Sequence, residues 1–294
     1  MNVAHYRALT LNGQGGKPIA VALTPGWEED ALRDLAALTG APLLACVTDL
    51  TGDTARVRYF KGRAEKPDSD SGALAVTAHL ARIGAYRGGL RVQSPGGIMR
   101  VGGNEHGGLI PQLGAPDDAL GHEAPLADED LHALLSALNL RATDLVGPPA
   151  QCGTATKRNA VLPLAGVADV AALQPQPDAL AEVQTRAGLS GVIPCTFNAP
   201  GRDVDYRFFA PARGLPEDRA GCFTFATLCA YMAHRHYGEG ARTLTGTQAS
   251  GSDAPGGLRA EVYLRDRSFT VATGGAVTPL TSGMNPTHAH EVRA

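Results

Sequence analysis

Short apolar runs separated by turn residues dominate the first half of the chain, a pattern typical of β-strands. We expect strands over 6–11, 18–23, 42–50 and 55–60, and a hairpin over 89–103. One segment has a different period, because Leu32, Leu35 and Leu38 recur at helical spacing and Gly40 follows where a helix would end. The pattern therefore predicts one amphipathic helix among these strands.

Two other segments are apolar on nearly every side and predict buried helices. Residues 72–84 ("GALAVTAHLARIG") consist almost entirely of small residues and good helix formers. Residues 221–235 ("GCFTFATLCAYMAHR") repeat this character in the second half of the chain. Because a helix without a polar face must be covered on all sides, we expect each of them at the centre of a structural unit.

The second half of the chain repeats the order of elements of the first. We expect helices over 125–138, 167–173 and 177–188, and strands over 159–166, 191–199, 203–211, 258–266 and 268–277. The run Arg58 to Phe60 precedes Pro67 by the interval at which Arg207 to Phe209 precedes Pro216, an offset of 149 residues. This match favours an internal duplication, and duplicated halves commonly form a ligand site in the cleft between them.

Composition restricts the class of protein. The chain has 294 residues, 44% hydrophobic and 19% charged, which suits one or two globular domains with a substantial core. Its formal net charge is -3 and it has no Lys/Arg block, so we expect no nucleic-acid partner. The N-terminal residues do not resemble a secretory signal, and no apolar run approaches the roughly eighteen residues of a membrane helix. We therefore expect a soluble, cytoplasmic protein without a membrane partner.

The cysteines and histidines do not form a recognisable metal motif. The five cysteines are spread along the chain without a CxxC pair: Cys46, Cys152, Cys195, Cys222 and Cys229. We expect them to be free thiols in a reducing cytoplasm, mostly packed in the core. The histidines within 234–240 and 287–294 are spaced two apart, which places them on opposite sides of a helix, so we expect no metal site.

Four motifs, in order along the chain, resemble the PhzF-like family of cofactor-independent isomerases. Residues 15–21 ("GGKPIAV") resemble a family turn "GGNPxAV", and residues 57–65 ("VRYFKGRAE") resemble "IRxFTPxxE". Residues 205–221 ("DYRFFAPARGLPEDRAG") resemble "SRxFxPxxGxxEDPATG", and residues 273–277 ("TGGAV") resemble a late family strand. The Phe-x-Pro and Glu-Asp segment is the most specific of the four.

The resemblance implies an α+β fold of the diaminopimelate epimerase type. Such a fold has two pseudo-symmetric domains, each a β-barrel-like sheet wrapped around a central helix. The two apolar helices would be these central helices. We assign residues 1–114 to the N-terminal half-domain and residues 115–279 to the C-terminal one, with residues 280–294 crossing back to the first. The sequence leaves open whether two copies form a homodimer.

The resemblance also implies that backbone N–H groups at the two central helix N-termini hold a substrate carboxylate, since the helix dipole favours an anion there. The substrate-binding positions would be Ser69, Ser71, Gly72 and Ala73 in the first half and Gly221 and Cys222 in the second. A pair of acid and base side chains would then move a proton between carbon atoms without a metal or cofactor. For Ser69 to Ser71, helix capping is the simpler interpretation.

Asp218 matches the family's catalytic aspartate, although a carboxylate there could also serve only to stabilise the helix N-terminus. The family's second acidic position falls at Leu43, which cannot carry a proton. Asp70, or Asp68 beside it, could replace this acid or could be a solvated turn residue. Lys17 replaces a family asparagine and could clamp a substrate carboxylate, or be a solvated loop lysine.

Cys222 raises a separate question, because a thiolate at a helix N-terminus can be a nucleophile or base. Cys229 lies seven residues later on the same helix face, which favours a packing role for both. The sequence thus predicts a PhzF-like isomerase acting on a small anionic, carboxylate-bearing molecule. The alternatives are a catalytically degenerate binding protein, which Leu43 and the altered turns favour, and a thiol-dependent racemase using Cys222.

Overall fold

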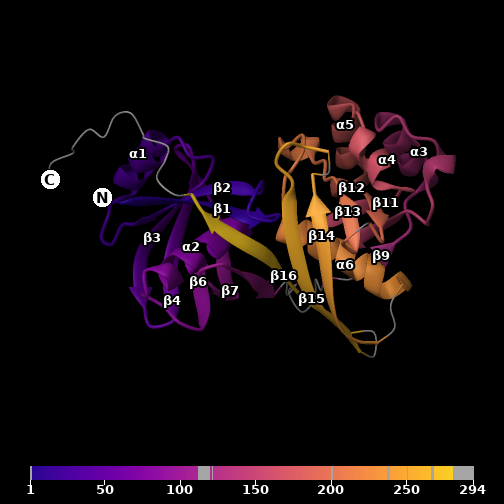
Figure 1. The fold of residues 1–294 in the computed structure, drawn as a ribbon. Coiled ribbons are helices and arrows are strands. Elements are labelled where there is room, and N and C mark those ends of the chain that lie inside the picture. Colours follow the sequence, from indigo (N-terminus) through magenta and orange to yellow (C-terminus); the bar gives the residue numbers. More distant parts are fainter. Residues whose placement is uncertain are drawn as a thin grey trace.

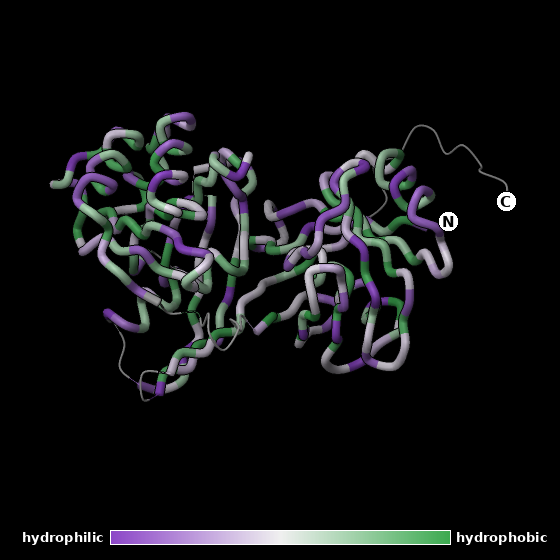
Figure 2. The backbone as a smooth tube through the Cα atoms, turned by 180° about the vertical axis from the view of Figure 1, so that it is seen from behind, coloured by the Kyte–Doolittle hydropathy of each residue, from purple (hydrophilic) through white to green (hydrophobic). Residues whose placement is uncertain are grey.

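The structure of the protein is a computed structural model that describes residues 2–111, 120, 122–199, 201–236, 239–249, 251–265 and 268–280. Within these ranges sixteen strands join in one continuous sheet, which curls into two lobes (Figure 1). Viewed from behind, the two lobes are joined by strands that run between them (Figure 2). None of the helices in these ranges combines the length and the apolar character that a membrane crossing needs.

The N-terminal lobe is a closed barrel. Its strands follow the order β1-β2-β3-β4-β6-β7-β8-β16, and β16 pairs with β1 to complete the ring. The strands are β1 (Val3–Thr10), β2 (Lys17–Leu23), β3 (Leu44–Thr51), β4 (Thr54–Lys61), β6 (Gly89–Ser94), β7 (Gly97–Asn104), β8 (Gly107–Pro111) and β16 (Ser268–Pro279). A short strand, β5 (Ala64–Lys66), pairs with β4 outside the ring.

The C-terminal lobe continues the sheet from the other side of β16. Its strands are β15 (Gly256–Arg265), β14 (Gly240–Gln248), β13 (Val204–Tyr206), β12 (Leu189–Phe197), β11 (Arg158–Pro163), β10 (Ala150–Gly153) and β9 (His122–Ala124), in this spatial order. The strand predicted over 203–211 ends at Tyr206, because the chain leaves the sheet there and turns through the short helix η2 (Pro211–Arg213). A further short helix, η1 (Ala142–Asp144), precedes β10.

Each lobe wraps its sheet around one apolar helix, as predicted. In the N-terminal lobe this helix is α2 (Asp70–Arg82), whose Leu74, Val76 and Leu80 are completely buried. In the C-terminal lobe it is α6 (Cys222–His236), which buries Phe225 and Met232, among others. The predicted α+β class, with a sheet wrapped around a central helix in each lobe, is confirmed; the two lobes share one continuous sheet.

The remaining helices cover the outer faces of the sheet. α1 (Glu29–Thr39) places Leu32 and Leu35 on β2 and β3 and ends at Gly40 in the left-handed conformation, as its spacing predicts. α3 (Asp128–Ala137), α4 (Val167–Ala172) and α5 (Pro177–Ala187) build a second apolar layer over β11 and β12. These helices show one polar face because only their other face is buried.

β16 connects the two lobes through backbone hydrogen bonds on both of its edges. It pairs with β1 and β8 of the N-terminal lobe and with β15 of the C-terminal lobe. A Cβ atom on Gly274 would lie 2.0 Å from the carbonyl oxygen of Gly108, and one on Gly275 would lie 2.6 Å from that of Gly257. The glycines of the "TGGAV" segment therefore allow three strands to meet where the lobes join.

The boundary predicted at residues 114 and 115 and the tail 281–294 lie outside the described residues, so the division into half-domains stays a prediction. In the described part, Leu280 donates its backbone N–H to the carbonyl oxygen of His5 at 2.8 Å. The end of β16 is thereby held against β1 of the N-terminal lobe.

Equivalent arginine–glutamate pairs precede the two central helices. Arg58 donates from Nε and Nη2 to Glu65 at 2.7 and 2.6 Å, and Arg207 does the same to Glu217 at 2.8 and 2.7 Å. Each glutamate precedes the first residue of its central helix by five positions. The offset between halves is 149 at the arginines and 152 at the glutamates, because η2 adds three residues. These pairs support an internal duplication.

We predict that Arg207→Met lowers the free energy of unfolding by about 2–3 kcal/mol, because it leaves the Glu217 carboxylate without its bidentate partner. It also removes the Nη1–H that Arg207 donates to the carbonyl oxygen of Leu173 at 2.7 Å. Urea denaturation followed by circular dichroism measures this change. The control is Arg63→Met, whose partner Asp34 is as exposed as Arg63 itself, and which should cost less than about 1 kcal/mol. Equal losses in the two variants would contradict the prediction.

Candidate active site

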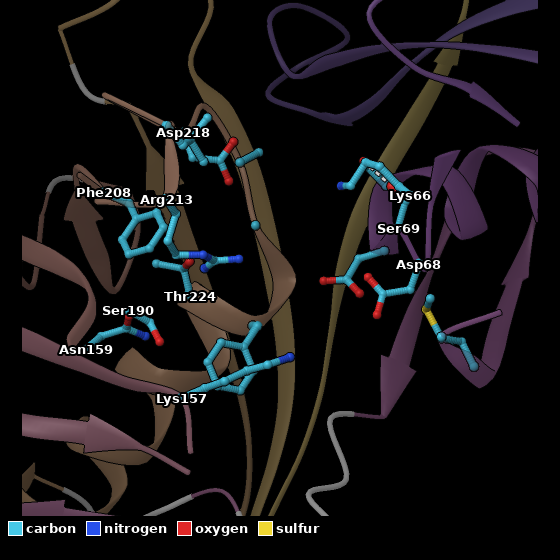
Figure 3. Close-up of a pocket in the computed structure, with 18 of the residues that line it drawn as sticks. Lys66, Asp68, Ser69, Lys157, Asn159, Ser190, Phe208, Arg213, Asp218 and Thr224 are labelled. Carbon is cyan, nitrogen blue, oxygen red and sulfur yellow. Dashed lines mark hydrogen bonds between the residues drawn. The ribbon is translucent and has the colours of Figure 1, made fainter. Parts of the chain in front are cut away.

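A cleft of about 590 Å³ lies between the lobes, with both central helix N-termini on its walls (Figure 3). The N-terminal lobe contributes Ser69, Asp70 and Ser71 from the start of α2. The C-terminal lobe contributes the segment 218–224 at the start of α6, although the side chains of Arg219 and Cys222 do not line the cleft. The structure therefore brings most of the predicted site residues together around one cavity.

Ser69 caps α2 with its side chain. Its Oγ accepts the backbone N–H of Gly72 at 3.1 Å and lies 3.3 Å from the Oγ of Ser71, and its carbonyl oxygen accepts the N–H of Ala73 at 2.8 Å. In this structure the Gly72 and Ala73 N–H groups, which the sequence assigned to a substrate anion, are therefore already hydrogen-bonded within the protein. In the described part of the chain, the N–H groups of Asp70 and Ser71 have no protein acceptor.

Gly72 is required at its position for a steric reason. A Cβ atom there would lie 2.5 Å from the Cε1 atom of Tyr59, whose ring is completely buried on β4. Such a contact is far shorter than van der Waals separation, so any side chain would push α2 away from the barrel wall. The sequence assigned Gly72 to anion binding, whereas the structure gives it a packing role.

The buried side chain of Gln248 hydrogen-bonds to the backbone of the residues that precede α6. The Gln248 Oε1 atom accepts the N–H of Gly221 at 2.8 Å and the hydroxyl of Tyr206 at 3.1 Å, and its Nε2 donates to the carbonyl oxygen of Asp218 at 2.8 Å. The predicted Gly221 N–H is thus not available to a ligand. Among the described residues, the N–H groups of Cys222, Phe223 and Thr224 have no protein acceptor and remain at this helix end.

Lys17 and Asp218 form an ion pair across the cleft. The Lys17 Nζ atom lies 2.7 Å from Oδ1 and 3.0 Å from Oδ2 of Asp218. Lys17 begins β2 in the N-terminal lobe, whereas Asp218 precedes α6 in the C-terminal lobe and donates its backbone N–H to the carbonyl oxygen of Phe208 at 3.0 Å. The lysine predicted to clamp a substrate carboxylate therefore holds the predicted catalytic carboxylate.

Asp70 lies in the first turn of α2 and is half-buried on the opposite wall of the cleft. Burial raises the pKa of its carboxyl above the ordinary value, while the positive charge of Lys17 acts in the opposite direction. The neighbouring carboxylate of Asp68, which is exposed, adds to the upward shift of the Asp70 pKa. Asp70 is thus the cleft carboxyl whose surroundings favour the protonated form.

The Cys222 side chain is completely buried and points into the core. Burial raises the pKa of its thiol well above the ordinary value, and the charge of Asp70 adds to this rise. Its carbonyl oxygen accepts the hydroxyl of Thr273 on β16 at 3.1 Å. These contacts correspond to the packing alternative, and only the backbone N–H of Cys222 remains a candidate for ligand binding.

Leu43, which the sequence resemblance aligns with an acidic position, packs in the apolar core with 8% of its surface exposed. Its side chain does not line the cleft. Of the histidines considered in the sequence, His234 has its ring 6.1 Å from that of Phe269, whereas residues 287–294 lie outside the described part. Across the described ranges, no group of three or more His, Cys, Asp or Glu side chains is arranged to hold a metal ion.

We predict that Asp70→Asn becomes more stable relative to the wild type as the pH rises. The raised pKa means that folded Asp70 binds its proton more tightly than the unfolded chain does, so its contribution is full below the unfolded pKa of about 4 and is lost as the pH rises through the folded value. Asparagine cannot ionise and avoids this loss. Urea denaturation at a series of pH values measures the difference, with the exposed Asp178→Asn on α5 as control. A growing disadvantage of Asp70→Asn with pH would contradict the prediction.

We predict that iodoacetamide labels the native protein slowly at neutral pH. All five cysteines are free and buried, and a protonated, inaccessible thiol does not react. Unfolding in urea should expose all five to rapid labelling, which mass spectrometry can count. Rapid modification of Cys222 in the native protein would contradict the packing role and restore the thiol hypothesis.

Three solved structures share this fold. A PhzF family protein from Bacillus anthracis superposes with a TM-score of 0.79 at 17% identity, covering 95% of this chain and 96% of that one. A predicted epimerase from Pseudomonas aeruginosa gives a TM-score of 0.70 at 18% identity, with the same coverage. A probable proline racemase from Agrobacterium radiobacter gives 0.52 at 13% identity, covering 97% and 94% of the two chains. These similarities confirm the predicted diaminopimelate epimerase-like fold.

Sequence comparison identifies the relatives. The uncharacterized isomerase YddE of Escherichia coli is 29% identical over 188 residues, which is 62% of this chain and 61% of that protein. An uncharacterized isomerase of Deinococcus radiodurans is 27% identical over 295 aligned positions, covering 94% of this chain and 92% of the relative. The family model described as phenazine biosynthesis-like protein matches residues 6–283. Since this match spans nearly the whole sequence, the chain belongs to the phenazine biosynthesis-like (PhzC-PhzF) protein family.

Proposed function

We propose that this protein is a cofactor-independent isomerase that moves a proton between carbon atoms of a small carboxylate-bearing substrate in the cleft. The observation that carries the proposal is that Asp70 and Asp218 line the same cleft from opposite lobes. Two carboxyl groups on opposite sides of a bound molecule can remove a proton at one position and return it at another.

The surroundings of the two carboxyl groups suggest how the roles divide. Burial raises the pKa of Asp70, which suits a proton donor. Asp218 is ion-paired with Lys17, which suits a base that is released when a substrate anion takes over the lysine. In this proposal Lys17 exchanges an internal carboxylate for one on the substrate, so binding and activation of the base are coupled.

The free N–H groups at the two helix starts would hold the substrate carboxylate. Asp70 and Ser71 line one wall, and Phe223 and Thr224 line the other, next to the N–H of Cys222 at the same helix start. Unpaired amides and the positive end of the helix dipole both favour an anion there. The small anionic partner expected from the sequence would thus bind next to the proposed acid and base.

The degenerate binding protein remains the second candidate, and Leu43 is the observation that favours it. With a leucine packed in the core at the family's acidic position, the chemistry requires that Asp70 has taken over that role. A binding protein would need only the cleft and the free amides.

Exchange of substrate C–H protons with solvent tests the proposal. In D₂O, ¹H NMR over a panel of amino acids and cyclic carboxylates should show loss of a C–H signal with the wild type. Asp218→Asn and Asp70→Asn should each slow this exchange by about a hundredfold or more, because each removes a group that transfers the proton. Asp178→Asn, which alters an exposed carboxylate on α5, should leave the rate unchanged. Absence of exchange with every compound of the panel would favour the binding protein.

A further inference from the structure

Asn159 is a buried cleft residue with an unused acceptor. It lies on β11, is 1% exposed and lines the cleft. Its Nδ2 donates to the hydroxyl of Thr227 at 3.3 Å, and that hydroxyl donates in turn to the carbonyl oxygen of Phe223 at 3.0 Å. This chain of donors fixes the orientation of the amide. Within the described residues, the Oδ1 atom has no hydrogen-bond partner.

A buried carbonyl oxygen without a donor costs about 1–3 kcal/mol. The amide of Asn159 is turned toward the cleft beside Ser190 (Figure 3). A leucine would fill the same space without this cost, so Asn159 is not explained by packing. An oxygen so placed fits a donor on a bound molecule.

Two cations flank Asn159 on the same wall. Figure 3 shows the Arg213 guanidinium on one side and the Lys157 ammonium on the other, both pointing into the cleft. Neither forms an ion pair with any described residue, although the Lys157 Nζ atom lies 5.7 Å from the centre of the Phe223 ring. The carboxylates of Asp68 and Asp70 are on the opposite wall. Two unpaired positive charges facing one cavity favour an anionic group between them.

We propose that Asn159, Lys157 and Arg213 form a second subsite that binds an acidic group carrying an adjacent hydroxyl. The acid lies between the two cations, and its hydroxyl donates to Asn159 Oδ1. A neutral hydroxyl suits the subsite better than an ammonium, because a third positive charge beside Arg213 and Lys157 would be repelled. Resting on the proposed function, which places one carboxylate at the helix N-termini, the inference defines the substrate class as a hydroxy-substituted diacid.

Calorimetric titration with three probes tests the subsite without requiring turnover. The probes are 2-hydroxyglutarate, glutarate, which lacks only the hydroxyl, and 2-hydroxybutyrate, which lacks the second acid. The wild type should bind 2-hydroxyglutarate about tenfold more tightly than glutarate, the usual gain from one hydrogen bond to a buried group. Asn159→Leu should remove this difference and leave glutarate binding unchanged.

Variants of the exposed cations keep the test decisive if Asn159→Leu does not fold. Arg213→Gln and Lys157→Gln should each weaken 2-hydroxyglutarate binding about tenfold, since each removes a charge-assisted contact. Arg91→Gln, an exposed arginine on β6 outside the cleft, is the matched control and should bind as the wild type does. Unchanged affinity in both cation variants, or no binding of any probe, would overturn the subsite.

The same titrations separate this inference from the proposed function. If 2-hydroxybutyrate binds as tightly as 2-hydroxyglutarate and responds to the subsite variants, the subsite stands and the helix-terminal carboxylate site fails. If solvent exchange is observed with monoacids while the cation variants bind every probe normally, the isomerase stands and the subsite fails.

Discussion

Each lobe encloses a helix within its own sheet, and this enclosure determines where a ligand can be bound. A helix covered along its whole length can present only its two ends to solvent. The first turns of α2 and α6 line the same cleft, so both helices direct unpaired N–H groups into it. The carboxylates, cations and buried amide of the cleft are arranged around this pair of positive helix ends.

Some charged side chains of the cleft are paired with an opposite charge and others are not. Lys17 and Asp218 neutralise each other across the two lobes, whereas Arg213 and Lys157 form no close ion pair in the described structure and Lys157 acts on Asp70 only at longer range. A ligand with acidic groups would rebalance the cavity, and one that reached Lys17 would also release Asp218. Substrate recognition and the state of the base would then depend on the same electrostatic exchange.

The sequence predicted the parts of this fold that have an uninterrupted pattern. The central helices were recognisable because they are apolar on all faces, and α1 because its leucines recur at helical spacing. β14 was missed because polar and small residues predominate in it, including the buried Gln248. Gln248 and Asn159 belong to no motif, and their roles arise only when the fold brings distant segments together. The sequence assigned Lys17 to a ligand because its actual partner, Asp218, lies 201 residues away and a local pattern does not show such a pair.

The use of β16 by both lobes has a consequence for how the chain folds during synthesis. The N-terminal barrel is closed by residues 268–279, so β1 and β8 each keep one unpaired edge until these residues have been synthesised. Exposed strand edges can pair with other chains. Contacts between segments so distant in sequence also form slowly. The barrel that is translated first therefore cannot close before the second lobe has been synthesised up to β16, and its early strands keep open edges during that interval.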